Sequence, residues 1–242
     1  AAWWMCLLPV AAMKQAGLPM PFFIKMDDVE YALQIKEQVV MMTGVCVWHE
    51  NFHLKYAPWN EYYITRNGCI TYALHGQAKN ALAVTLELWR TVLHLLFLHR
   101  YDTAKFVLQG YRDFLRGWKW LQKTDAITLH RQILQQQAAT EQFQTDCTEV
   151  PNSIPQVSFF EATRAAVQKQ KSVFLFHPFT KKGFYASRKK GTAFQLLLKM
   201  GGISLRMLAT YRSVVQGFQK NRTVLCEDAA WNQRNQHNSE KK

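Results

Sequence analysis

Apolar side chains recur every three or four residues through the middle of the chain, from about Ala78 to Ala139. This spacing places them on one face of a helix, so it predicts amphipathic helices packed on a shared core. The first stripe consists of Leu82, Leu86, Trp89, Leu93 and Leu96. The pattern breaks near Arg100, and Asp102 and Asp125 are of the residue type that caps a helix N-terminus. We therefore expect three helices here, the second capped by Asp102 and the third by Asp125.

The N-terminal part mixes short strand and helix signals. Trp3–Val10 has strand composition, and Val39–Met42 with Gly44–Trp48 is typical of one or two strands around a turn. Between these stretches we expect a helix from residues 27–28 to about residue 38. A second helix is expected after them, over Trp59–His75. Position 49 then falls at a strand end, a usual place for a functional side chain.

The C-terminal part is also mixed. Ser172–Phe176 is the strongest strand candidate there, and Phe184–Tyr185 and Thr223–Cys226 are weaker ones. Ser158 followed by Glu161 fits a capping box that opens a helix. The pair Gly201–Gly202 is expected to break the preceding apolar run, and the polar end of the chain is expected to be a disordered tail.

Composition narrows the function. The chain has 242 residues and a formal net charge of +13, which favours anionic partners such as phosphate-bearing substrates, nucleic acid or an acidic membrane surface. The five cysteines form no Cys-x-x-Cys pair, so they indicate neither a zinc site nor a disulfide framework, and reduced thiols in the cytosol are expected. No apolar run approaches the ~20 residues of a membrane helix. The chain begins inside a strand-like stretch, so we expect an N-terminal part to precede it.

Three carboxylates lie within four residues, at Asp27, Asp28 and Glu30, after the apolar run Pro21–Ile24. Adjacent acids at a helix start commonly serve only as caps that complement the helix dipole. A carboxylate at the edge of a core can instead act as a general base toward a hydroxyl nucleophile. The second acid could then orient the hydroxyls of an acceptor.

A histidine and several aromatic residues follow. His49, beside Trp48, is either a packed histidine or a ligand that joins carboxylates around a divalent ion. Trp48, Trp59 and Tyr63 offer flat faces for sugar rings, although core packing uses the same residues. Arg66 and Asn67 could donate hydrogen bonds to substrate oxygens, or form a helix-terminal salt bridge and cap.

A run of cations lies between apolar segments near the C-terminus. It consists of Lys181, Lys182, Arg188, Lys189 and Lys190. Such a run is usually a solvated face. It could also contact acidic lipid headgroups, at about 1 kcal/mol for each charge near the surface.

Three motifs taken together resemble a known family. They are Pro-x-Phe-Ile-Lys-x-Asp-Asp-x-Glu-Tyr from Pro21, Val-Trp-His-Glu from Val47, and Trp-x-x-Tyr-Tyr-x-x-Arg-Asn from Trp59. This set resembles the family-2 glycosyltransferases of the bacterial galactofuranosyltransferase type. The resemblance implies inverting enzymes with a GT-A nucleotide-sugar domain followed by a helical C-terminal domain.

The resemblance also implies roles for these residues. Asp28 would be the catalytic base, with Asp27 and Glu30 positioning the acceptor sugar or Asp28 itself. His49 would be a ligand of a divalent metal, Mg or Mn, that stabilises the diphosphate leaving group. The acceptor would contact the residues Asp27, Glu30, Trp48, Trp59, Tyr63, Arg66 and Asn67.

The predicted fold is α/β, the end of a GT-A domain over residues 1–74, then a mostly helical domain with a few short strands over 75–230 and a tail over 231–242. The predicted function is transfer of galactofuranose or a similar hexose from a nucleotide-diphosphate donor to a cell-surface or lipid-linked glycan. The predicted location is the cytoplasmic face of the inner membrane, with peripheral contact to anionic lipid, possible homo-oligomers and no nucleic-acid partner. The alternative is a non-catalytic basic helical module that binds an anionic membrane or nucleic acid.

Overall fold

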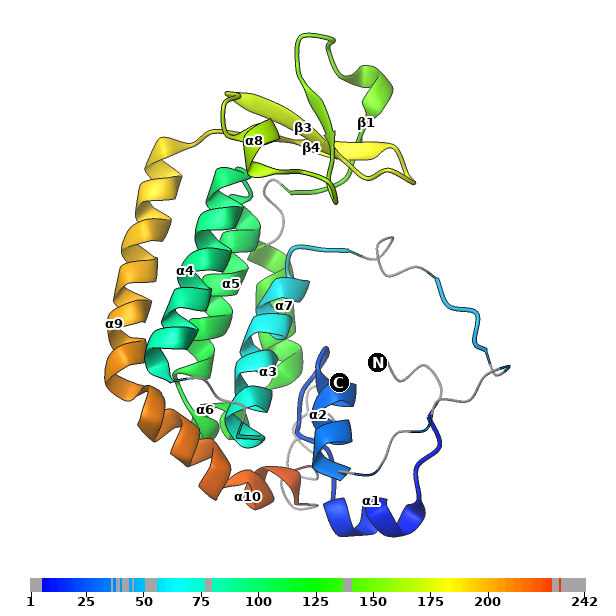
Figure 1. The fold of residues 1–242 in the computed structure, drawn as a ribbon, viewed down its shortest axis with the longest axis vertical. Helices are drawn as coiled ribbons and strands as arrows, with labels where there is room; N and C mark the ends of the chain where they lie inside the picture. Colours follow the sequence, from blue (N-terminus) through cyan, green and yellow to red (C-terminus); the bar gives the residue numbers. More distant parts are fainter. Residues whose placement is uncertain are drawn as a thin grey trace.

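The computed structural model describes residues 6–35, 37, 40, 44, 46–50, 56–76, 80–136, 141–227 and 231. In Figure 1 the helices α3, α4, α5 and α9 stand side by side, with a small sheet across one end and α1 and α2 near the other. The helices are α1 (Val10–Ala16), α2 (Asp27–Ile35), α3 (Asn60–Leu74), α4 (Ala81–Phe97), α5 (Tyr101–Phe114), α6 (Trp118–Lys123), α7 (Ala126–Gln136), α8 (Arg164–Val167), α9 (Lys190–Lys220) and α10 (Arg222–Cys226). The strands are β1 (Thr145–Asp146), β2 (Gln156–Ser158), β3 (Ser172–Phe176) and β4 (Lys182–Ser187), and a 3₁₀ turn, η2, spans Cys147–Glu149.

The bundle is held together by one continuous apolar core. Helix α3 packs along α5, and α9 contacts α3, α4 and α5. Buried side chains from all four helices meet there, including Ile70, Leu88, Phe114 and Met200. Residues on both sides of position 74, the boundary predicted between two domains, therefore share this core. No helix in the described part of the chain is long and apolar enough to cross a membrane.

Helix α9 runs without a break through Gly201 and Gly202, so the expected interruption there is wrong. Each glycine costs about 1 kcal/mol relative to alanine in a helix interior. The helix persists because its buried residues recur at helical spacing and pack on the bundle. These residues are Leu196, Met200, Ser204, Met207, Tyr211 and Phe218. Tertiary packing therefore outweighs local propensity here.

The sheet has the order β1-β4-β3-β2, with β2 parallel to β3 and the other pairs antiparallel. The strands expected around residues 172–176 and 184–185 are confirmed as β3 and β4, with Leu175 opposite Phe184. Their inner face forms a second core with Phe159, Val167 and Leu98. The structure is thus mixed α/β, a helical bundle with a small sheet.

Two local predictions in the C-terminal part are wrong, and the first fails because the pairing partner of β2 lies farther along the chain. Ser158 ends strand β2 beside Phe176 and caps no helix. The following helix, α8, is capped by the hydroxyl of Thr163, which accepts a hydrogen bond from the Ala166 amide. The weak strand expected at residues 223–226 is instead the helix α10.

Helix α5 is capped from a distance. Its first turn contains Asp102, which was expected to be the cap, and the helix begins at Tyr101. The buried carboxylate of Glu141 accepts hydrogen bonds from the amides of Asp102 and Thr103 at 2.8 and 3.0 Å. Asp125, by contrast, is confirmed in its role at the start of α7, where it accepts from the Ile127 and Thr128 amides.

The N-terminal strand predictions are not supported where the structure describes the residues. Residues 6–9 and 46–50 have no regular structure, and Val10 begins α1. Residues 1–5, 39, 41–43 and 45 lie outside the described residues, as do 232–242 of the expected tail. The helices expected after residue 27 and after Trp59 are confirmed as α2 and α3.

A close approach of α3 and α5 gives a first test. A Cβ atom on Gly110 would lie 2.8 Å from both the Tyr62 carbonyl oxygen and the Thr65 Cβ atom. Gly110→Ala should therefore lower the free energy of unfolding by about 1–3 kcal/mol, although alanine is the better helix former. Gly202→Ala, where nothing lies within 4 Å, is the matched control and should be neutral or stabilising by up to about 1 kcal/mol. Denaturant unfolding measures both, and equal effects would contradict the close packing.

Candidate functional site

The acidic segment begins with a sharp turn. Lys25 and Met26 have φ angles of 65° and 67°, in the left-handed region that side chains other than glycine rarely adopt. Each such residue costs on the order of 1–2 kcal/mol, so the surrounding structure must hold them. Helix α2 starts directly after the turn. Its first residue, Asp27, is exposed, and Asp28 is half-buried. The Asp28 carboxylate accepts a hydrogen bond of 2.8 Å from the Val29 amide.

The side chain of Asn67 holds this turn. Its Nδ2 group donates to the carbonyl oxygens of Ile24 and Lys25, both at 2.9 Å. Its Oδ1 atom accepts from Nε of Arg66 at 2.8 Å, and the Asn67 residue has no exposed surface. The amide therefore ties α3 to the backbone that leads into the two aspartates.

A buried polar chain extends from Asn67 to α5. Arg66, which is 3% exposed, donates from Nη1 to the Tyr62 hydroxyl at 3.2 Å. That hydroxyl donates to Oδ2 of Asp113 at 3.1 Å. The Arg66 guanidinium also lies 5.2 Å from the ring centres of Tyr62 and Tyr63. Burial is the main cause that raises the pKa of Tyr62, so its hydroxyl stays protonated and available as a donor.

Three predicted acceptor ligands are therefore buried and bound to the protein itself. Arg66 and Asn67 make the bonds just described. The Glu30 carboxylate is fully buried, accepts from the Met20 amide, and lies 3.0 Å from Nε2 of His75, the residue that follows α3. The polar atoms of all three residues are thus bonded within the protein, and their contact with an acceptor stays a prediction.

An aromatic cluster adjoins the acidic segment. Phe23, Trp59 and Tyr63 gather around His130 of α7, whose ring centre lies 5.0, 5.1 and 6.0 Å from theirs. Tyr63 is fully buried, whereas Trp59 and His130 are half-buried and Phe23 is 44% exposed. The predicted site residues Trp59 and Tyr63 are thus brought together with the segment that carries Asp28. His130 was missed, because a single histidine in a polar helix gives no signal in the sequence.

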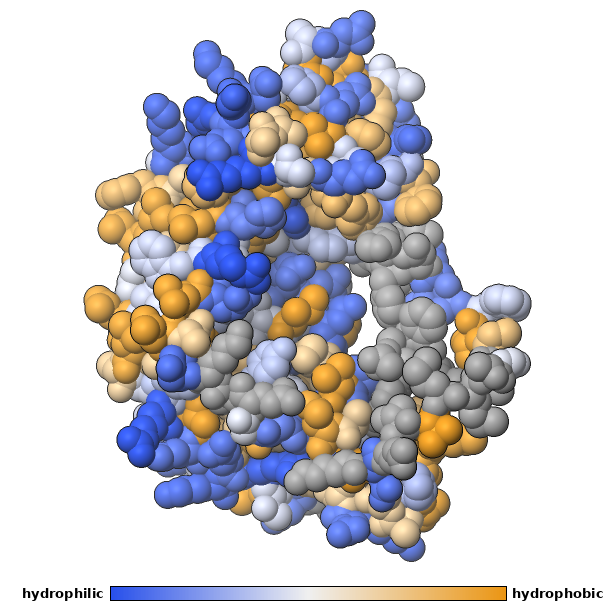
Figure 2. Space-filling model, in the orientation of Figure 1, coloured by the Kyte–Doolittle hydropathy of each residue, from blue (hydrophilic) through white to orange (hydrophobic). Residues whose placement is uncertain are grey.

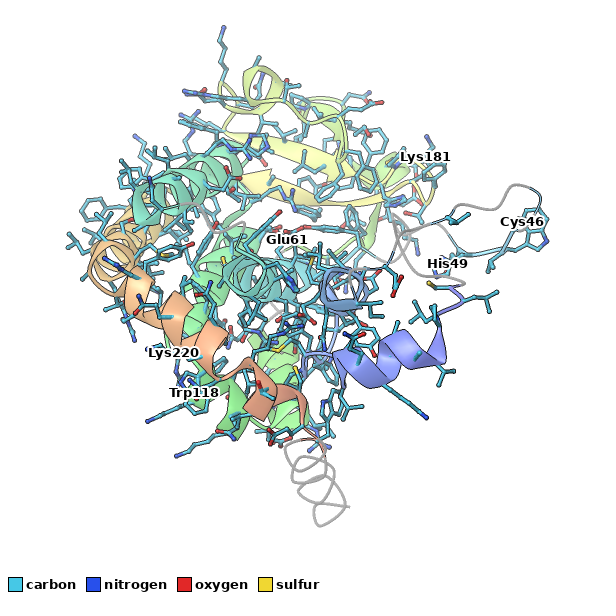
Figure 3. The ribbon with its side chains drawn as sticks, turned by 60° about the horizontal axis from the view of Figure 1, so that its bottom comes forward. Cys46, His49, Glu61, Trp118, Lys181 and Lys220 are labelled. Atoms are coloured by element: carbon cyan, nitrogen blue, oxygen red, sulfur yellow. The ribbon has the colours of Figure 1, made fainter. Side chains whose placement is uncertain are left out.

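Glu61 is a second residue that the sequence did not single out. It lies in the first turn of α3, between the bundle and the sheet in Figure 3. Burial raises the pKa of its carboxyl, while the nearby charges of Arg100 and Lys25 oppose that shift. Carboxyls with raised pKa values are common at functional sites.

His49 and Trp48 lie elsewhere. Both belong to the exposed stretch 46–50, and Trp48 is 92% exposed. Figures 1 and 3 show this stretch on a loop that stands away from α2. No group of three or more His, Cys, Asp or Glu side chains within the described residues is arranged to hold a metal ion. These residues do not by themselves form the predicted Mg or Mn site, and the metal role of His49 stays a prediction.

A pocket also opens between the sheet and the segment before α3. It is lined by Tyr56, Ala57, Pro58, Glu141, Gln142, Phe143, Gln144, His177, Thr180 and Lys182. None of the predicted site residues lines it. The acids and aromatic rings described above therefore remain the candidate site.

A pair of aspartates beside a cluster of aromatic rings suits carbohydrate chemistry, and comparison with known proteins supports a relationship to glycosyltransferases. The chain is similar to the galactofuranosyltransferase GlfT2 of Mycolicibacterium smegmatis, with 34% identity over 120 residues, which are 48% of this chain and 18% of that protein. It is also similar to the GlfT2 of Mycobacterium tuberculosis, with 32% identity over 123 residues, 48% of this chain and 19% of that protein. The chain thus spans less than a fifth of the length of these relatives. No protein-family model matches it.

The turn before α2 gives the second test. Asn67→Ala leaves the Ile24 and Lys25 carbonyls without their donor and should lower the free energy of unfolding by about 1–3 kcal/mol. Lys25→Gly removes the strain of a left-handed φ, so it should recover about 1 kcal/mol in the Asn67→Ala background. Lys25→Ala is the control, because it removes the charge and keeps the Cβ atom. Equal recovery by both Lys25 variants would argue against backbone strain at this turn.

Proposed function

We propose that the chain is part of an inverting glycosyltransferase that transfers galactofuranose or a similar hexose from a nucleotide-diphosphate donor to a glycan acceptor. The observation that carries the proposal is the Asp27–Asp28 pair, presented at the start of α2 by a turn that Asn67 fixes. The similarity to two galactofuranosyltransferases supports this chemistry.

The reaction needs a base at the acceptor hydroxyl. As the hydroxyl oxygen attacks the anomeric carbon of the donor, its proton passes to the Asp28 carboxylate and the bond from that carbon to the diphosphate oxygen breaks. The N-terminus of α2 and the Val29 amide stabilise negative charge on Asp28 before the transfer. Exposed Asp27, one residue earlier, is placed to accept hydrogen bonds from other acceptor hydroxyls.

Replacement of the base tests the proposal. In the full-length protein, Asp28→Asn should lower the rate of sugar transfer by about 10²–10⁴-fold, because an amide cannot take the proton. Glu149→Gln makes the same change of carboxylate to amide at an exposed residue of η2 and should leave transfer unchanged. The assay follows product formed from a panel of nucleotide-diphosphate sugars. Undiminished transfer by Asp28→Asn would remove Asp28 as base, whereas no transfer from any donor by the unaltered full-length protein would favour the non-catalytic alternative.

Peripheral contact with an anionic membrane is a second part of the proposal. The predicted cation run is divided between the two ends of β4: Lys181 precedes the strand and Lys182 begins it, whereas Arg188, Lys189 and Lys190 follow its end. A broader surface lies on α4 and α9, where Figure 2 shows apolar side chains over both helices. Its exposed members are Leu82, Leu86, Trp89, Phe194, Leu198, Leu205 and Leu208. Exposed Lys190, Lys199 and Arg206 on α9 add positive charge.

Vesicle binding tests this surface. Leu198→Glu with Leu205→Glu should weaken binding to vesicles that contain anionic lipid by roughly tenfold or more, since burial of each leucine contributes about 1.5–3 kcal/mol. Leu134→Glu, on α7, is the control for adding charge at an exposed leucine. Binding should also fall as salt rises. If the double variant binds vesicles normally but changes the mass measured by light scattering, the surface belongs to a homo-oligomer instead.

A further inference from the structure

The cluster of Phe23, Trp59, Tyr63 and His130 offers aromatic ring faces and an imidazole, which the aspartates do not supply. Its members come from three separate places in the chain: the segment before α2, the start of α3, and the middle of α7. Trp59 meets His130 edge to face, at an interplanar angle of 79°, and Phe23 lies tilted against the same imidazole at 44°. Phe23 remains 44% exposed although it is large and apolar. A partly exposed aromatic ring beside other half-buried rings offers a flat contact surface to a ligand.

The hydrogen bond to Tyr63 favours the tautomer of His130 that carries its proton on Nε2. The Tyr63 hydroxyl lies 3.2 Å from Nδ1 of His130. Burial raises the pKa of Tyr63 to about 12, so the hydroxyl keeps its proton, and the imidazole is the acceptor that the described residues offer it. Burial also lowers the pKa of His130, which favours the neutral ring. With Nδ1 accepting, the remaining proton is on Nε2, and His130 is a hydrogen-bond donor without a net charge.

The cluster is fixed relative to the aspartates. Tyr63 and Asn67 are one helical turn apart on α3, and Asn67 binds the Ile24 and Lys25 carbonyls between Phe23 and Asp27. The same helix therefore positions both the aromatic rings and the turn that presents Asp28. A ligand that placed one hydroxyl at Asp28 would extend over the neighbouring protein surface, to which Phe23 belongs.

The chemistry of the cluster selects the ligand. Aromatic faces pack on the apolar C–H face of a sugar ring, and a neutral N–H donates to its hydroxyl oxygens. The four side chains carry no net charge when the imidazole is neutral, so they offer no positive charge to the diphosphate of a donor. The site therefore suits an uncharged sugar of the acceptor glycan.

We propose that Phe23, Trp59 and His130 form a subsite for a neutral sugar of the acceptor, with Tyr63 holding the imidazole so that Nε2 donates. This assignment rests on the proposed glycosyltransferase function. It adds His130, a residue from the middle of the helical region, to the acceptor site.

The test measures acceptor binding apart from catalysis. The full-length protein is prepared with Asp28→Asn, so that an alkyl galactofuranoside probe can bind without turnover, and its affinity is measured by calorimetry. His130→Leu should weaken binding by roughly three- to tenfold, the effect of losing one hydrogen bond. His130→Gln retains an N–H donor and should lose less. His94→Ala, at an exposed histidine of α4, is the control and should bind like the parent.

Kinetics in the otherwise unaltered protein give the second readout. His130→Leu and Tyr63→Phe should raise the KM for the acceptor, while the KM for the donor and the slow hydrolysis of donor without acceptor stay unchanged. A structural role would instead change donor and acceptor parameters together and lower the melting temperature of both variants. Unchanged acceptor affinity in His130→Leu, or equal losses in the Leu and Gln variants, would overturn the subsite. No transfer from any donor by the unaltered full-length protein would overturn the proposed function, whereas normal transfer by Asp28→Asn would overturn only the role of Asp28 as base.

Discussion

The side-chain amide of Asn67 is the contact on which the candidate site depends. Two consecutive residues in the left-handed region are unfavourable for any chain without glycine, and the turn at Lys25 and Met26 contains both. The amide offsets this cost by donating to two successive carbonyls from a position with no access to water. Since α2 begins at the next residue, the direction of that helix and the exposure of its two aspartates follow from this contact.

Burying the charge of Arg66 in α3 is possible because its guanidinium has partners inside the protein. A guanidinium at 3% exposure would be costly to desolvate if it stood by itself. Arg66 is instead shared between the Asn67 amide, the Tyr62 hydroxyl and two tyrosine rings. Asp113 completes the chain on α5, where Gly110 allows the two helices to approach closely. The buried polar chain from Asn67 to Asp113 thus lies in the core of the bundle.

The sequence predicted those features that depend on neighbours in the chain. The helix after Asp125, the helix over Asn60–Leu74 and the strand Ser172–Phe176 follow from local caps and periodicity, and all three are present. Features set by distant partners were missed. Glu141 caps α5 from 39 residues away, and α9 continues through two glycines because the bundle packs against it.

The same difference between local and long-range contacts explains which site residues the sequence predicted. Pattern alone identified Asp27, Asp28, Trp59 and Tyr63 as candidates, and the structure places the rings beside the acidic segment. It could not show that Arg66 and Asn67 face inward, because a helix of polar and aromatic residues has no clear apolar stripe from which to read its buried face. His130 enters only through the packing of α7 on the start of α3, a long-range contact that leaves no periodic trace in the sequence.

The proposed site has a charged part, the two aspartates, and a neutral part, the aromatic cluster. Helix α3 holds both parts in place. The aspartates need water or substrate around them to exchange a proton, so they stand at the end of a turn where α2 emerges from the bundle. In the aromatic cluster the inner ring, Tyr63, is fully buried, and burial lowers the pKa of the His130 imidazole, which favours its neutral form. Asn67 serves the first part and Tyr63 the second, one helical turn apart. A shift of α3 against α5 would therefore move both parts together and preserve the spacing between base and sugar, which a site built on independent loops would lose.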